Sequence, residues 1–116
     1  MTEGIQTILY PATDLAAAKA AFVALIGAEP EQDQPYYVGW NVGGQTFGLV
    51  PNADKQGLTG PTPYWHVADI ETTIKAMVDQ GATVTVEPRD VGGGRLTAAV
   101  TVDGNVVGLL QDPVRE

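Results

Sequence analysis

The sequence Asn41-Val-Gly-Gly-Gln-Thr-Phe-Gly-Leu49 recurs in the second half of the chain as Thr101-Val-Asp-Gly-Asn-Val-Val-Gly-Leu109. Each copy has two turn-forming residues between strand-like runs, which is the pattern of a two-residue β-hairpin with a primed turn. Each copy also follows a strand-like run, a helix pattern that begins after an Asp, and a Gly. The repetition predicts two copies of one folding unit, and such a pair suggests one site built between the two halves.

The same order of elements precedes each hairpin. In the first half, Ile5–Ala12 predicts a strand, Asp14 is the N-cap of a helix that begins at Leu15, and Gly27 ends that helix. The second half repeats this order with the strand Tyr64–Val67, the N-cap Asp69, the helix Ile70–Gln80 and the final Gly81. In that helix, Ile74, Met77 and Val78 are predicted to face inward. Further strands are predicted near Gly27–Glu31 and at Tyr36–Val42, Gln45–Val50, Thr83–Glu87, Leu96–Val102 and Asn105–Leu110.

The length of 116 residues fits one domain with its own core. We expect module one at residues 4–52, a linker at 53–61 and module two at 62–113. The predicted fold class is α+β, with two βαβββ modules that form a cupped mixed β-sheet and helices packed outside it.

Composition excludes several functions. A net charge of -8 disfavours nucleic acid and anionic membranes as partners, whereas it tolerates a cationic small molecule. Without Cys the chain has no disulfide, no zinc–thiolate site and no thiol nucleophile, and without Ser it has no serine nucleophile. The sequence shows neither a signal peptide nor a long apolar span, so a cytoplasmic location is expected.

The hairpin turns fix which residues share a face of the sheet, because paired residues in neighbouring strands point the same way. One face is apolar and is predicted to pack under the helices; it includes Val38, Trp40, Val42, Phe47, Leu49, Trp65, Val67, Val84, Val86, Val100, Val102, Val107 and Leu109. The opposite face is mostly small and hydroxylic; it includes Tyr37, Gly39, Gly48, Thr62, Tyr64, His66, Arg95, Thr97, Ala99, Thr101 and Gly108. We interpret this second face as the wall of a hollow.

A family pattern runs through the stretches Thr13–Phe22 with Gly27, Phe47–Val50, Trp65–Ile70 and Val102–Leu109. In this order they resemble the vicinal oxygen chelate superfamily, which includes glyoxalase I, extradiol dioxygenases and bleomycin-resistance proteins. The resemblance covers residues 4–113 and implies a single glyoxalase-like domain over 1–116. It also implies two βαβββ modules whose sheets curl around the site, and commonly a homodimer.

The resemblance also locates the positions that hold the metal in metal-binding members. These members place His or Gln seven residues before each helix-capping Asp and Glu in the final strand of each module. In this chain the corresponding residues are Thr7, Gly48, Thr62 and Gly108. None carries a carboxylate or an imidazole, which a divalent cation needs to replace its hydration shell. We therefore expect no metal and no other cofactor at these positions.

Five side chains are candidates for ligand binding. His66 is the only histidine and is predicted to face the hollow, where it could hydrogen-bond a ligand or move a proton. Tyr37 and Tyr64 offer aromatic walls that suit apolar or cationic ligands. Arg95 follows the flexible stretch Gly92–Gly94, a possible lid, and could pair with a carboxylate such as Glu87.

The sequence therefore predicts a metal-free small-molecule-binding protein of the glyoxalase/bleomycin-resistance type, with its ligand between the two modules. The ligand would be a small organic molecule, cationic or aromatic. One alternative is a lyase or isomerase that uses His66 as base and Arg95 to hold an oxyanion. A second is a metalloenzyme with ligands elsewhere, for example His66 with Glu87. A third is a regulatory or scaffold module with a vestigial site.

Overall fold

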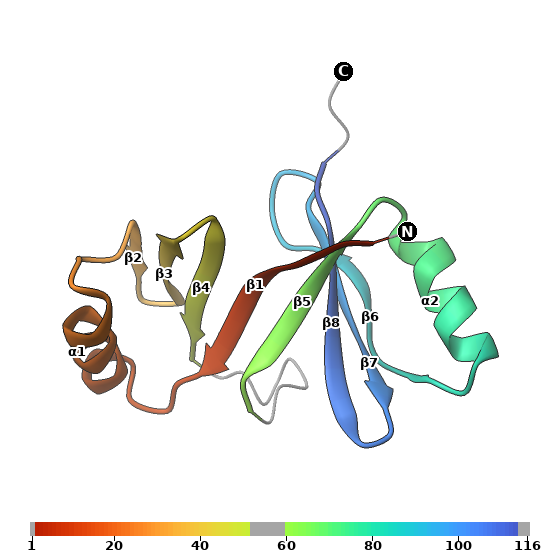
Figure 1. The fold of residues 1–116 in the computed structure, drawn as a ribbon, viewed down its shortest axis with the longest axis horizontal. Helices are drawn as coiled ribbons and strands as arrows, with labels where there is room; N and C mark the ends of the chain where they lie inside the picture. The colour runs from red at the N-terminus through yellow and green to blue at the C-terminus, as the bar shows by residue number, and fades with distance from the viewer. Residues whose placement is uncertain (1, 52–59, 114–116) are drawn as a thin grey trace. The chain divides into compact units, whose positions relative to one another are not determined.

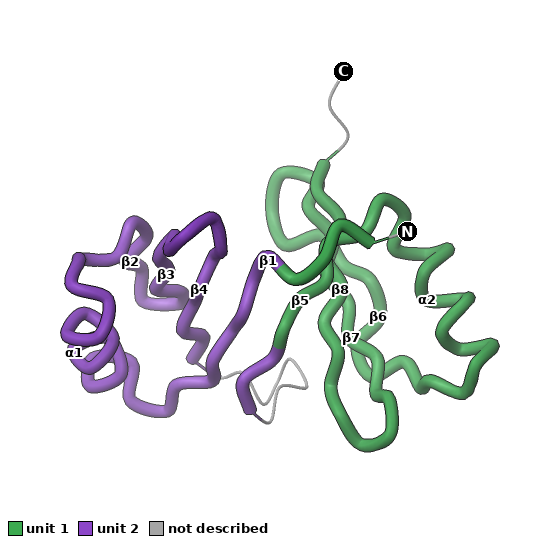
Figure 2. The backbone as a smooth tube through the Cα atoms, in the orientation of Figure 1, with its two compact units in different colours: residues 1–5, 63–116 green, residues 6–62 purple. Residues whose placement is uncertain are grey.

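The computed structural model describes residues 2–51 and 60–113, which contain two helices and eight strands in the order βαβββ, βαβββ (Figure 1). The predicted α+β class and the two repeated modules are confirmed. Two compact units divide the chain (Figure 2): unit 1 comprises Met1–Ile5 and Pro63–Glu116, and unit 2 comprises Gln6–Thr62. Most of the predicted linker 53–61 lies outside the described residues.

Unit 2 is a four-stranded sheet covered by helix α1 (Leu15–Ile26). Its strands are β1 (Thr2–Pro11, from Gln6 onward), β2 (Gln32–Gln34), β3 (Tyr37–Val42) and β4 (Gln45–Val50). They lie in the order β2-β3-β4-β1, parallel between β1 and β4 and antiparallel elsewhere. The aromatic side chains of Phe22, Trp40 and Phe47 pack between helix and sheet, as the alternation predicted.

Unit 1 repeats this plan with helix α2 (Ile70–Asp79). Its strands are β5 (Thr62–Val67, from Pro63 onward), β6 (Thr83–Asp90), β7 (Leu96–Val102) and β8 (Asn105–Gln111). They lie in the order β5-β8-β7-β6, with β5 parallel to β8. The core between α2 and the sheet contains Val67, Ile70, Ile74, Val100 and Leu109, each no more than 9% exposed.

The helix caps and hairpin turns have the predicted conformations. The Asp14 carboxylate accepts a hydrogen bond from the Ala17 N–H at 3.0 Å, and the Asp69 carboxylate accepts one from the Thr72 N–H at 3.1 Å. Both residues of each hairpin turn have positive φ, including the non-glycine Asp103 at 49°. This is the primed-turn geometry, so the predicted registers, such as Gly39 opposite Gly48 and Ala99 opposite Gly108, are confirmed.

Three local predictions are wrong, each for an identifiable reason. The strand predicted at Gly27–Glu31 is β2 at Gln32–Gln34, because Gly27 ends the helix in the left-handed conformation and Pro30 has no N–H for a ladder. Val78 is 43% exposed because Ile70, Ile74 and Met77 define the buried stripe and Val78 lies at its border. Val86 pairs with Ala99, on the sheet face away from α2, because β6 contains a bulge.

Both hairpins extend beyond their helices at the turn end. Val42 and Val102, which were predicted on the helix-covered face, are 45% and 39% exposed. Within residues 2–51 and 60–113, neither helix has the length and apolar character needed to cross a membrane.

Candidate ligand-binding face

The sheet of unit 1 has one face under α2 and one face turned away from it. We call the second face the binding face. The pairing registers place Tyr64, His66, Val86, Arg89, Thr97, Ala99, Gly108 and Leu110 on it. We add Arg95 and Asp112, which flank β7 and β8 and are linked to His66 through the Asp112 carboxylate. Two cross-strand rows organise it. One runs Tyr64–Gly108–Ala99–Val86 and the next runs His66–Leu110–Thr97–Arg89. Three predicted site residues of module two, Tyr64, His66 and Arg95, therefore share one face.

Asp112 connects two of these residues. Its carboxylate lies 3.5 Å from His66 Nδ1 and 3.2 Å from an Arg95 guanidinium nitrogen. The His66 side chain is 12% exposed, whereas Asp112 and Arg95 are about half exposed. Sequence reasoning missed Asp112 because it follows the last strand, although its even spacing from Gly108 and Leu110 could have placed it on this face.

Arg89 reaches the binding face through the irregular pairing of β6. Register shifts between Val84 and Val86 and between Val86 and Arg89 leave Arg89 opposite Thr97. Each shift adds one residue to β6, so the two together return Arg89 to the face on which alternation from Thr83 would place it. Sequence reasoning missed Arg89 because the predicted strand ended at Glu87, whereas β6 continues to Asp90. The side chain of Arg89 is exposed.

The Tyr64 ring lies flat over Gly108. A Cβ atom added to Gly108 would stand 2.6–2.7 Å from ring atoms of Tyr64, including the first ring carbon, closer than real Cβ contacts. Tyr64 is only 5% exposed, and burial raises the pKa of its phenol, while the nearby Arg89 guanidinium lowers that pKa to a smaller extent. The phenol therefore stays protonated over the physiological range and remains a hydrogen-bond donor.

This pKa shift makes a prediction for alkaline pH. The folded state keeps the Tyr64 proton at pH values where the unfolded chain has lost it, so the free energy of unfolding falls as the pH rises above about 10. We expect Tyr64→Phe to remove part of this decline, measured by urea unfolding between pH 8 and 11 in wild type and variant. Tyr36→Phe is the control, because Tyr36 is 71% exposed. Parallel curves for wild type and Tyr64→Phe would contradict the assignment.

Unit 2 carries an equivalent arrangement at Tyr37. Gly39 and Gly48 are neighbours across β3 and β4, and an added Cβ at either would stand 2.5–2.9 Å from the outer half of the Tyr37 ring. In each module an aromatic ring thus occupies the space above the Gly that stands at the family's glutamate position. The structure places Tyr37 in unit 2 and Tyr64, His66, Glu87 and Arg95 in unit 1.

The residues at the family's metal positions do not fit a divalent cation. Gly48 and Gly108 carry no donor, and the space beside each is filled by a Tyr ring. Thr62 is 1% exposed, and its hydroxyl donates to the Gly60 carbonyl oxygen at 2.9 Å. Thr7 is also buried, at 8% exposure. In the part of the chain that the structure describes, no three His, Asp or Glu side chains gather as a metal-ligand set. The His66 and Glu87 pair therefore has no third ligand among these residues.

The segment around the three glycines is a hydrogen-bonded turn. The Asp90 carboxylate accepts from the Gly92 N–H at 2.7 Å, and the Val91 N–H donates to the Arg95 carbonyl at 2.9 Å. Gly92, Gly93 and Gly94 all have positive φ, which explains the requirement for glycine in a turn this tight. Arg95 leaves this turn and pairs with Asp112, while Glu87 is exposed.

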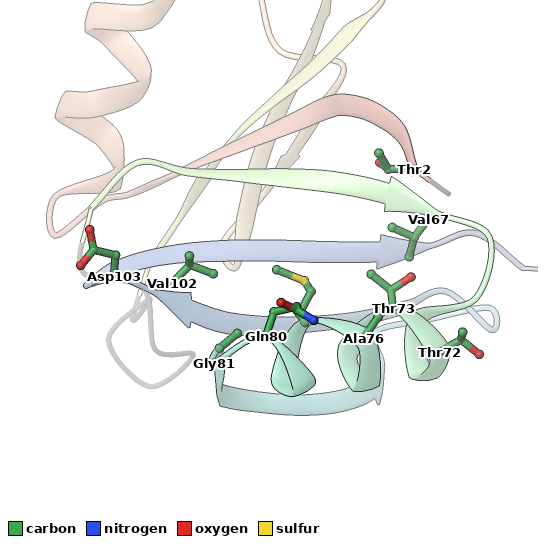
Figure 3. Close-up of a pocket in the computed structure, with 11 residues that line it drawn as sticks. Thr2, Val67, Thr72, Thr73, Ala76, Gln80, Gly81, Val102 and Asp103 are labelled. Atoms are coloured by element: carbon green, nitrogen blue, oxygen red, sulfur yellow. The ribbon is translucent and has the colours of Figure 1, made fainter.

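A separate groove of about 780 Å³ lies on the opposite side of unit 1 (Figure 3). It runs between α2 and the ends of β5 and β7, and the side chains of Thr73, Met77 and Val102 contribute to its walls. The Thr73 hydroxyl already donates to the Asp69 carbonyl oxygen at 2.8 Å.

Comparisons with known proteins agree with this fold. No family model and no curated protein sequence matches the chain. Solved structures do match, and each comparison covers at least 90% of both chains. A glyoxalase/bleomycin resistance protein/dioxygenase superfamily member from Vibrio splendidus has a TM-score of 0.71 at 16% identity. Methylmalonyl-CoA epimerase from Mycobacterium tuberculosis has 0.75 at 15%, and a protein described as NAD-dependent benzaldehyde dehydrogenase from Legionella pneumophila has 0.74 at 14%.

These structural matches confirm the fold expected from the sequence motifs, that of the vicinal oxygen chelate proteins. At identities of 14–16% they establish the fold alone.

Proposed function

We propose that this protein binds a small organic molecule on the binding face of unit 1 without the help of a metal ion. The observation that carries the proposal is the assembly of Tyr64, His66, Arg89, Arg95 and Asp112 on one sheet face. Small side chains lie between them, since Ala99 and Gly108 occupy the centre of the same face. An aromatic wall with a few polar groups around a small-residue floor is the composition of a ligand site.

The metal-free part of the proposal rests on the side chains at the family positions. Thr7, Gly48, Thr62 and Gly108 offer no charged donor, and two Tyr rings stand where the family's carboxylates would lie. The proteins of similar fold include an epimerase named for methylmalonyl-CoA, which is a small-molecule thioester. That similarity supports small-molecule binding as the general function. The type of ligand is inferred from the residues of this chain alone.

A fragment screen tests the binding proposal. We expect aromatic fragments, added to ¹⁵N-labelled protein in the presence of EDTA, to shift the backbone amides of Ala99, Thr97 and Leu110 on the binding face. Replacing Thr97 with Gln fills the floor of this face and should weaken binding about tenfold, by analogy with the cost of overfilling a packed site. Thr73→Gln, in the groove beside α2, is the matched control. Shifts confined to the α2 groove would contradict the proposal.

One observation favours a second candidate, a lyase or isomerase. The Asp112 carboxylate contacts both His66 Nδ1 and Arg95, so it can orient the imidazole as a base while Arg95 remains near a developing oxyanion. Proton abstraction from a bound carbon acid in D₂O would exchange its C–H for C–D, which ¹H NMR detects. The binding proposal predicts no exchange. Exchange that is lost in His66→Gln, with binding retained, would favour the enzyme.

The state of assembly and the location are also proposals. The resemblance to the family favours a homodimer, whereas the cytoplasmic location is expected from the sequence itself. Multi-angle light scattering of the full chain measures the state of assembly directly. A mass of about twice 12.2 kDa at micromolar concentration is the expected result.

A further inference from the structure

We propose that the bound molecule carries an anionic oxygen group, a carboxylate or a phosphate, which Arg89 and Arg95 bind above Thr97. This inference rests on the proposed function and adds the chemical class of the ligand. It differs from the cationic ligand suggested by the net charge, because the local charge of the binding face is opposite to that of the whole chain.

The distribution of basic residues is the first support. The chain has six Lys and Arg against fourteen Asp and Glu. The structure describes four of these basic side chains, namely Lys19, Lys75, Arg89 and Arg95. Both described arginines lie on the binding face, whereas Lys19 pairs with Asp33 in unit 2 and Lys75 lies on helix α2. In an acidic protein, the two described arginines on one face present a local site for an anion.

The pairing registers bring the two arginines to one place. Arg89 stands directly across from Thr97, and Arg95 lies two residues before Thr97 on the same side of the chain. Neighbouring strands are about 4.8 Å apart and alternate residues in a strand about 6.8 Å apart, so both guanidinium groups can reach one anion above the Thr97 hydroxyl. Arg is suited to this role because its planar group donates two parallel hydrogen bonds to a carboxylate or phosphate.

The two arginines are not equivalent. Arg95 is paired with Asp112, which neutralises part of its charge and fixes its position. Among the described residues Arg89 has no carboxylate within ion-pair distance, and its positive charge lowers the pKa of the Tyr64 phenol. Arg89 is therefore the main source of uncompensated positive charge on this face. Glu87 is also exposed on β6, and its negative charge reduces the net positive charge of that strand.

Three probes test this inference on the full chain. Benzoate and benzamide have the same ring and nearly the same shape but differ in charge, and inorganic phosphate supplies an oxyanion without a ring. We expect benzoate to bind at least about tenfold more tightly than benzamide, because a charge-assisted hydrogen bond is roughly twice as strong as a neutral one. The amide shifts of Thr97 and Leu110 during each titration give the dissociation constants and the location together.

Charge variants identify the residue responsible. Arg89→Gln should abolish the preference for benzoate over benzamide, and Arg89→Lys should retain part of it, whereas Lys75→Gln removes the same charge elsewhere and should leave it unchanged. Phosphate shifts that disappear in Arg89→Gln would assign the site to phosphate groups as well, and benzoate shifts alone would assign it to carboxylates. Either result supports the inference, and the retained response of Arg89→Lys shows that the face still folds.

Two outcomes would overturn the inference. Equal binding of benzoate and benzamide on the binding face would refute the anionic ligand class while leaving the proposed binding function intact. No response of Thr97 and Leu110 to any of the three probes would also refute it, and the uncharged aromatic fragments then decide separately whether the face binds small molecules at all.

Discussion

Gly108→Ala lowers the free energy of unfolding by about 2–3 kcal/mol, which is the upper range for adding a methyl group to a filled site. The new Cβ would stand 2.6–2.7 Å from the Tyr64 ring, and one of the atoms it meets is the ring carbon nearest the backbone. Rotation of the ring cannot move that carbon far away. The strain therefore passes to β5 and β8, which Tyr64 and Gly108 join in register.

Gly48→Ala is the matched comparison, because Gly48 occupies the same place in the other module. There the new Cβ meets the outer half of the Tyr37 ring, which is only partly buried and can turn aside. We expect a cost below about 1 kcal/mol, partly offset by the lower entropy of the unfolded chain. Gly60→Ala is the neutral control, since among the described residues no atom beyond its chain neighbours lies within 4 Å of its added Cβ. Equal costs at positions 48 and 108 would contradict the model of a fixed Tyr64 ring.

Removal of the Tyr64 ring should reduce the loss of stability caused by Gly108→Ala. In a double-mutant cycle of urea unfolding, Tyr64→Ala with Gly108→Ala should cost less than the sum of the two single changes, because the clash no longer exists. Gly108→Glu should be worse than Gly108→Ala, since it adds a carboxylate to a buried position without a partner. A glutamate that restored the family's ligand would therefore unfold unit 1 rather than create a metal site.

Trp40→Ala lowers the free energy of unfolding by about 3–5 kcal/mol, the range for truncating a buried Trp. Trp40 is 2% exposed, stacks on Phe47 with ring centroids 5.4 Å apart, and donates its indole N–H to the Ala28 carbonyl oxygen at 3.0 Å. That last bond holds the segment after α1 against the sheet. The substitution therefore removes core packing and leaves a carbonyl without its donor.

Trp65→Ala is the comparison for this change, measured by the same urea unfolding. Trp65 is only partly buried in the core of unit 1, and it lines a second, smaller cavity of about 360 Å³ beside α2. We expect a smaller loss than for Trp40→Ala, by about 1 kcal/mol or more. A larger loss at Trp65 would mean that the cores of the two units are not organised as described.

The repeated hairpins made the fold predictable from sequence. Gly43–Gly44 and Asp103–Gly104 favour a two-residue primed turn, and that turn sets the register of the β3–β4 and β7–β8 pairs. The errors arose where no such constraint acts. Alternation could not foresee the bulges of β6, and the first of them moved Val86 to the binding face.

The candidate site was predictable only in part. Alternation correctly brought Tyr64 and His66 to the same face of β5, and the hairpin register correctly placed Gly108 beside Tyr64. The contact of Asp112 with His66 joins positions 46 residues apart in sequence, and no motif in the sequence signals it. The aromatic rings above Gly48 and Gly108 could have been found from the glycines themselves, because a bare strand glycine is commonly covered by a neighbouring ring.

The central claim, binding without a metal ion, is tested most directly by calorimetric titration of one compound selected in the fragment screen. The titration is made first in EDTA and then with excess Zn²⁺, Mn²⁺ or Mg²⁺, with elemental analysis of the purified protein. The account predicts dissociation constants that agree within about twofold in all conditions and no stoichiometric transition metal. Affinity that rises tenfold or more with one of these ions, or one equivalent of metal in the purified chain, would contradict it.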